Sequence, residues 1–169
     1  MAEEKVENWV DWVKRLAGFA RASNQTAYAR MKISLQQEWN FVQRVTPGIG
    51  TIFASLDASL RYDFFPDMLG ERIEEITDFL HKQITWAVKQ AGIGIPDPNQ
   101  TVPTNFETLE HCYEILTPST TNGEALNLRA HTSQVRKGRD VGMDSRVNRD
   151  EGDLRALKIT FGNNSKRKV

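Results

Sequence analysis

Helical periodicity organises the first two-thirds of the chain. From Glu3 to Ala22, apolar side chains recur at steps of three and four residues, which places them on one face of a helix. These residues are Val6, Val10, Val13, Leu16 and Phe19, with Trp9 and Trp12 widening the stripe. A second helix is predicted to begin at an Asn24 cap and to end before Pro47, which has no N–H group to continue the backbone ladder. The apolar face of this helix carries Tyr28, Met31, Leu35, Trp39 and Val42. The stretch SLQQEWNFVQRVTPGIG is therefore chiefly the core-facing end of a helix and the turn that terminates it, and Arg44 points outward.

Two further helices and a connector are expected next. Apolar residues in register between Ile49 and Leu60 predict a third helix, which the run ending at Pro66 interrupts and Gly70 closes. The segment 73–87 predicts a fourth helix, with an acidic polar face that includes Glu71, Glu74, Glu75 and Asp78. Residues 91–103, AGIGIPDPNQTVP, are rich in glycine and proline and predict an extended connector.

The remaining sequence predicts two more helices and a tail. Thr104 and Glu107 have the spacing of a capping box, which would open a fifth helix. A sixth helix is expected over residues 124–135, after the TPSTTNG segment, with Leu128, His131 and Val135 facing inward. No segment shows convincing strand alternation. We therefore expect an all-α fold, an irregular bundle of about five to six helices over residues 1–138, and a basic flexible tail over 139–169.

The net charge changes sign along the chain. Residues 1–128 contain 11 Lys and Arg against 17 Asp and Glu, a net charge of −6. Residues 129–169 contain 11 against 5, a net charge of +6. A basic arm of this kind can bind polyanions, and it can equally be a solvated end without a partner.

Composition favours an intracellular protein. The acidic start, MAEEKVENWV, lacks the basic and then apolar segments of a secretory signal, and no apolar run is long enough to span a membrane. The single cysteine, Cys112, excludes an internal disulfide and suits a reducing compartment. We expect a cytoplasmic or nuclear location and no contact with membranes.

No residues form a convincing catalytic or metal site. His111 and Cys112 are neighbours, so on a helix they point about 100° apart, and a buried structural cysteine beside a surface histidine is the more frequent arrangement. The acidic face that begins at Glu71 is typical of a solvated helix surface. We expect no catalytic residues, no metal and no cofactor.

Basic and aromatic residues alternate along the first two helices. Lys14, Arg15, Arg21, Arg30, Lys32 and Arg44 are interleaved with Trp12, Tyr28 and Trp39. Such a mixture can hold a nucleic-acid backbone and stack on bases, although aromatics at helical spacing more often belong to a core.

Several segments together resemble reverse transcriptase polyproteins encoded by retroelements. They are EKVENWVDWVKRLAGFARASNQTAYA, SLQQEWNFVQRVTPGI with FASLDASLRYDFFPDMLG, GIGIPDP and LRAHTSQVRKGR, within roughly residues 3–139. The resemblance is to the region that follows the catalytic palm. The Tyr-x-Asp-Asp motif of the palm is absent from this chain, so no polymerase residue can be assigned here.

The resemblance implies a non-catalytic, thumb-like fragment that touches a template–primer duplex through its phosphates. Such contacts need only basic side chains and backbone N–H groups. The candidate residues are Lys32, Arg44, Arg129, Arg136, Lys137 and Arg139. Further expected partners are the palm domain of a parent polyprotein, or a second copy held through exposed apolar faces. The alternative is a stand-alone helical protein–protein interaction module that binds no nucleic acid.

Overall fold

Helices are the only regular secondary structure among the residues that the computed structural model describes. These are residues 2–70, 76–138, 140, 141, 144, 148, 151, 152 and 155. The predicted all-α class is confirmed. The expected acidic positions Glu71, Glu74 and Glu75 and most of the expected tail lie outside the described residues, and the division at 138/139 stays a prediction.

The first two predicted helices are present and pack through their apolar stripes. The predicted cap at Asn24 is wrong, because Ser23 stands at the cap position and Asn24 is the first helical residue. Helix α1 spans Ala2–Ala20, and the next helical run comprises α2 (Asn24–Arg30), a π-helical turn (Met31–Leu35) and α3 (Gln36–Val45). Met31 and Trp39 are fully buried. The run stops at Thr46, whose backbone is extended just before Pro47, as predicted.

The third helical run is longer than the sequence predicts. It begins with a 3₁₀ turn (Gly50–Phe53) and continues through α4 (Ala54–Ser59), a π-helical turn (Leu60–Phe64) and α5 (Phe65–Leu69), where Gly70 ends it with a φ of 98°. The predicted interruption at Pro66 is wrong. Pro66 falls in the first turn of α5, where its missing N–H costs little, and the wide π turn precedes it.

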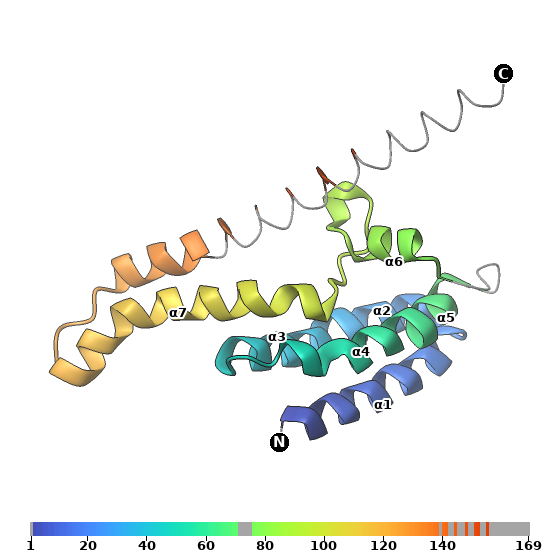
Figure 1. Cartoon of the computed structure of the whole chain (residues 1–169), viewed down its shortest axis with the longest axis horizontal. Coiled ribbons are helices and arrows are strands. Elements are labelled where there is room, and N and C mark those ends of the chain that lie inside the picture. The colour runs from blue at the N-terminus through green and yellow to red at the C-terminus, as the bar shows by residue number, and fades with distance from the viewer. Residues whose placement is uncertain are drawn as a thin grey trace.

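These three helical runs enclose the main core. Helix α1 packs against α2, α4 and α5 (Figure 1). The indole of Trp9 stacks on the ring of Phe53, with 6.2 Å between ring centroids, and Trp39 and Phe64 are also completely buried. Burial of these large side chains supplies most of the driving force for folding.

A shorter segment follows and covers one end of the bundle. Helix α6 spans Asp78–Thr85 and begins at Thr77, whose side chain accepts the N–H of Leu80. A 3₁₀ turn (Val88–Gln90) follows an extended Trp86, so the predicted helix over 73–87 is too long at its C-terminal end. It is also predicted to start too early, because Ile76 and Thr77 precede the helix.

The predicted connector is helical in its second half. Helix α7 spans Pro98–Asn122, because Pro98 stands at its first position and Asp97 caps it by accepting the N–H of Asn99 at 2.8 Å. The predicted capping box at Thr104 is therefore wrong, since Thr104 lies inside α7. Only residues 91–97 form a loop.

A helix over residues 128–138 follows α7 and runs back along it (Figure 1). It begins later than predicted, because the Asn127 side chain accepts the N–H of Ala130 at 3.0 Å and caps it there. Leu128 is 66% exposed, so its predicted inward orientation is wrong. Gly138 lies against Thr108 of α7.

Candidate functional site

Lys32 forms a hydrogen bond within the fold. Its ammonium donates a hydrogen bond to the carbonyl oxygen of Gly94 at 2.5 Å, while the Tyr28 hydroxyl donates to the carbonyl oxygen of Ile93 at 2.7 Å. The π turn that carries Lys32 thus holds the 91–97 loop against the helical body. Nucleic-acid contact by Lys32 stays a prediction.

The other predicted basic residues do not gather on one surface. Arg44 is exposed at the end of α3 beside a hollow that Glu110 and Glu114 also line. Arg129, Arg136 and Lys137 are exposed on the helix over 128–138, which lies on the opposite side of α7 from α3 (Figure 1). Arg139 lies outside the described residues.

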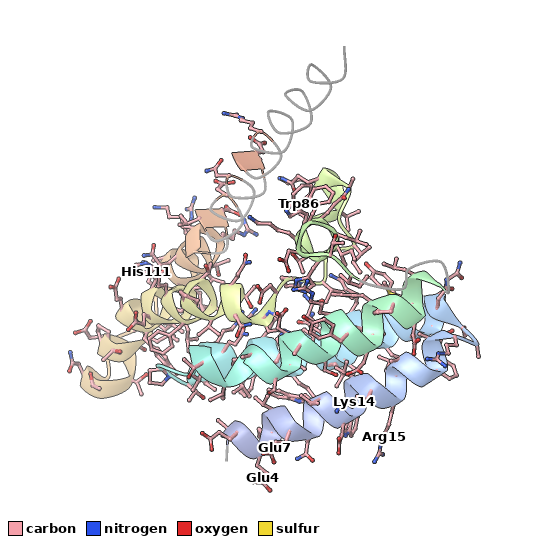
Figure 2. All side chains as sticks on the ribbon, turned by 45° about the vertical axis from the view of Figure 1, so that its right-hand side comes forward. Glu4, Glu7, Lys14, Arg15, Trp86 and His111 are labelled. Atoms are coloured by element: carbon pink, nitrogen blue, oxygen red, sulfur yellow. The ribbon has the colours of Figure 1, made fainter. Side chains whose placement is uncertain are left out.

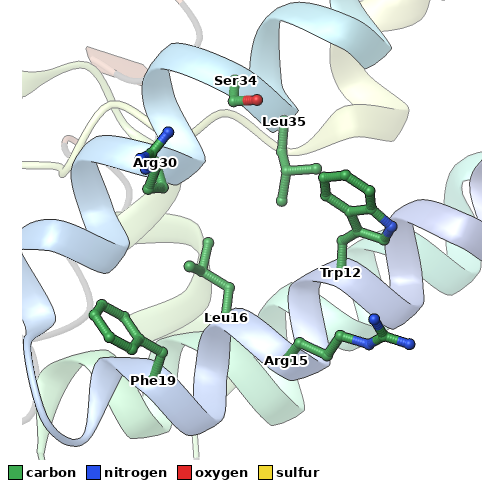
Figure 3. Close-up of a pocket in the computed structure, with 7 residues that line it drawn as sticks. All are labelled: Trp12, Arg15, Leu16, Phe19, Arg30, Ser34 and Leu35. Atoms are coloured by element: carbon green, nitrogen blue, oxygen red, sulfur yellow. The ribbon is translucent and has the colours of Figure 1, made fainter.

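A groove between α1 and the helical run that follows it combines aromatic and basic side chains. Trp12, Arg15, Leu16 and Phe19 line it from α1, and Arg30, Ser34 and Leu35 line it from the other side. We call it the α1–α2 groove; its volume is about 420 Å³. Figure 3 shows Leu16 between Trp12 and Phe19, with Arg30 across the opening. This volume is within the range of roughly 300–1,000 Å³ typical of small-molecule sites.

The aromatic residues of this groove are open to solvent. Trp12 is 55% exposed and Phe19 47% exposed, so the prediction that Phe19 faces the core is wrong. The other three tryptophans, Trp9, Trp39 and Trp86, are each at most 4% exposed. Trp12 is therefore the one tryptophan of this chain that a ligand can reach.

The groove is also the positively charged part of an acidic body. Residues 12–37 contain five basic residues, Lys14, Arg15, Arg21, Arg30 and Lys32, and no Asp or Glu. Figure 2 shows the change along α1, from Glu4 and Glu7 near its start to Lys14 and Arg15 farther on.

Three of these cations are available to an anion. Arg21 forms an ion pair with Asp67 at 2.9 Å, and Lys32 bonds to Gly94. Within the described part of the chain, Lys14, Arg15 and Arg30 have no carboxylate partner. A ligand carrying negative charge would therefore meet cations here that the fold does not already neutralise.

The local backbone explains the shape of this groove. The second helical run widens into a π turn at Met31–Leu35, which buries Met31 and Leu35 and brings Ser34 to the groove. Short π turns within helices often occur at functional sites. Alternation of basic and aromatic residues along the sequence does not by itself locate the groove. The absence of Asp and Glu over residues 12–37 is the signal that distinguishes it.

A second polar cluster joins α4, α6 and the start of α7. The Nε2 atom of the buried His81 lies 3.3 Å from Oδ1 of Asp57. Burial raises the pKa of Asp97, and the charge of Asp57 raises it further, while the N–H groups of Asn99 and Gln100 oppose the shift. Among the described residues, no group of three or more His, Cys, Asp or Glu side chains is placed to hold a metal ion.

The expected arrangement of His111 and Cys112 is confirmed. His111 is exposed, whereas Cys112 is buried and its thiol contacts the carbonyl oxygen of Thr108 one helical turn earlier. The two side chains point in different directions from α7, as neighbouring residues on a helix do.

No protein-family model, curated protein or solved structure matches this chain. In the described portion of the chain, none of the helices has both the length and the apolar character needed to cross a membrane.

Proposed function

We propose that this chain is a non-catalytic helical region of a retroelement-type reverse transcriptase, and that it binds the nucleic-acid backbone without sequence preference. The proposal rests on the resemblance of its aromatic, proline and glycine segments to the region after the palm. The all-α fold is compatible with a thumb-like role. The parent protein would be an RNA-directed DNA polymerase whose catalytic aspartates lie in another segment.

The observation that carries the proposal is the α1–α2 groove. Arg15 and Arg30 line it from two different helices, and Lys14 stands next to Arg15 in the same acid-free window. Guanidinium groups donate hydrogen bonds in a fork geometry that suits phosphate oxygens. Phosphate contacts of this kind position a protein on nucleic acid without reading bases.

Three of the basic residues predicted from the sequence form a second, separate surface in this proposal. Arg129, Arg136 and Lys137 are exposed on one helix and add positive charge along α7. Arg44 is weaker in this respect, because Glu110 and Glu114 line the same hollow and repel phosphate.

The test is the salt dependence of binding. Fluorescence anisotropy with labelled single-stranded and duplex oligonucleotides of unrelated sequences should show similar affinities among sequences and a steep loss between about 50 and 200 mM salt. The paired variant Arg15→Gln/Arg30→Gln should weaken binding and reduce the salt slope. The variant Arg129→Gln/Arg136→Gln/Lys137→Gln measures the second surface separately. Absence of binding at low salt, or affinity that salt does not change, would contradict the proposal.

A protein–protein interaction module is the second candidate function. Its supporting observation is exposed apolar surface: Trp12 and Phe19 of the groove are open to solvent, and Ile33, which precedes the groove residue Ser34 in sequence, is 76% exposed. Exposed apolar surface of this kind often marks a protein contact. Association through it would respond weakly to salt and would appear in sedimentation of the chain alone if the partner were a second copy.

A further inference from the structure

We infer that the α1–α2 groove binds single-stranded nucleic acid, with one base stacked on Trp12 and the adjacent phosphates held by Arg15 and Arg30. This inference rests on the proposed nucleic-acid binding and adds which form of nucleic acid the groove accepts. Its starting point is the combination of an exposed indole with cations that no described carboxylate neutralises.

The exposed indole favours unpaired bases. A base within a duplex is stacked on both faces, so a protein aromatic can stack on it only after the base is unstacked at a cost of a few kcal/mol. A single strand offers free base faces and flexible phosphates. Trp12 is 55% exposed, and its indole lines the groove beside Leu35, so we expect one face of the ring to accept a base (Figure 3).

The spacing of the groove residues suits a short strand. Trp12 and Phe19 are separated by seven residues of α1, which corresponds to roughly 10 Å along the helix axis. Arg15 lies between them in sequence, and Arg30 lines the opposite wall. A strand that follows α1 would place a base at Trp12 and then pass both guanidinium groups.

Charge decides between this occupant and an apolar peptide. A helical peptide would fill the apolar part of the groove, formed by Leu16, Phe19 and Leu35. It would not require two arginines at the walls that no described carboxylate neutralises. The absence of Asp and Glu over residues 12–37, in a body with a net charge of −6, complements the phosphates of a polyanion. The groove thus matches a ligand that carries both flat apolar rings and negative charge.

Tryptophan fluorescence provides a direct experiment. Because the other three tryptophans are buried, quenching by a stacked base reports Trp12. Oligothymidylate should quench the emission of the full chain, and a blunt oligo(dA)·oligo(dT) duplex of equal length should quench it far less. Trp12→Ala should weaken binding of oligothymidylate, measured by anisotropy, about 5- to 100-fold and leave the salt slope unchanged.

The arginine variants should act differently. Arg15→Gln and Arg30→Gln should each lower the slope of log K against log salt concentration by about 0.7 while quenching at saturation persists. Phe41→Ala, at an aromatic residue that is 62% exposed outside the groove, and Lys89→Gln, at an exposed cation, are the matched controls and should leave binding unchanged. Trp12→Phe keeps an aromatic ring and should retain more affinity than Trp12→Ala, which separates stacking from any effect on folding.

The possible failures are distinguishable. If both nucleic acids bind but Trp12→Ala behaves like Phe41→Ala, or the duplex quenches as strongly as the single strand, this inference is overturned and the proposed function stands. If neither nucleic acid binds at low salt, the proposed function fails as well. Quenching by an acidic amphipathic peptide but not by oligothymidylate would assign the groove to a protein partner and overturn the inference.

Discussion

Asp97 combines two opposing effects at a single residue. Its carboxylate caps α7 by accepting the N–H of Asn99, which stabilises the helix. Its partial burial and the neighbouring Asp57 raise its pKa, which means that the ionised carboxylate is destabilised in the folded state. The cap is therefore kept at an electrostatic cost that depends on pH.

Replacing Asp97 with asparagine should stabilise the protein at neutral pH. The pKa of Asp97 is higher in the folded state than the ordinary carboxyl value of about 4, so the protonated form is favoured by folding. This contribution to stability is fully present below about pH 4 and is lost as the pH rises through the pKa of the folded state. The asparagine side chain would keep the cap and remove the charge, so Asp97→Asn should melt at a higher temperature than the wild type at pH 7. The difference should shrink as the pH falls below about 4.

Asp97→Ala separates the two effects. Alanine removes the charge together with the cap, whose loss costs about 1 kcal/mol, so this variant should be less stable than Asp97→Asn at every pH. Thermal melts of the two variants and the wild type, followed by circular dichroism across the pH range, make the comparison. Equal stability of the wild type and Asp97→Asn at pH 7 would contradict the electrostatic account.

At the scale of elements, a buried polar contact joins α3 to α7. The Gln43 side chain is fully buried and donates a hydrogen bond to the carbonyl oxygen of Pro98 at 2.8 Å. Its amide oxygen accepts hydrogen bonds from Thr101 at 2.9 Å and from Asn105 at 2.6 Å. This contact fixes the first turns of α7 on α3, and α7 remains helical through Pro103 although that residue has no N–H group.

Gln43→Leu should lower the free energy of unfolding by about 1–3 kcal/mol. Leucine has nearly the same size, but it removes a buried donor to the Pro98 carbonyl and the acceptor that the Thr101 hydroxyl and the Asn105 amide share. Urea denaturation measures the change. Gln37→Leu, on the exposed side of the same helix, is the control and should shift stability by no more than about 0.5 kcal/mol. A similar effect of both variants would show that the α3–α7 contact is not specific.

At the scale of the whole molecule, the tryptophans report how the chain is folded. Trp9 and Trp39 belong to the main core, and Trp86 is buried near the 91–97 loop, where a Cβ on Gly92 would lie 2.2 Å from the Trp86 carbonyl oxygen. Trp12 alone faces solvent. We therefore expect Trp12 to be accessible to a quencher in solution and the other three tryptophans to be protected from it.

Acrylamide quenching of the native protein should therefore show two classes of emission. Trp12→Phe should remove the accessible class and leave the protected one, whereas denaturant should make all four tryptophans of the wild type accessible. Protection of Trp12 that increases with protein concentration would show that a second copy covers the groove. Quenching of all four tryptophans in the native protein would contradict the buried core.

The sequence predicted the elements whose determinants are local, and it failed where distant contacts decide. The stripe containing Met31 and Trp39 was correctly assigned to the core, and the stop before Pro47 was correct, because periodicity and a missing N–H act within a few residues. Pro66 and Pro103 were expected to lie at breaks. Pro66 lies in the first turn of α5 behind a wide π turn, where its missing N–H costs little. Pro103 lies inside α7, where packing against α3 favours the helix by more than the proline disfavours it.

The candidate site shows the same division. The sequence by itself determined that the chain is helical, that it carries its aromatic residues at helical spacing, and that acidic residues are absent over residues 12–37. Only the tertiary structure decided that Trp9 enters the core while Trp12 stays exposed, and that the Lys32 ammonium is bonded to Gly94 while Arg30 reaches a groove with Arg15. The physical reason is that the neighbouring helices determine how much of an apolar stripe is buried. Those helices lie far away in the sequence, so the stripe alone does not show which of its side chains stay exposed.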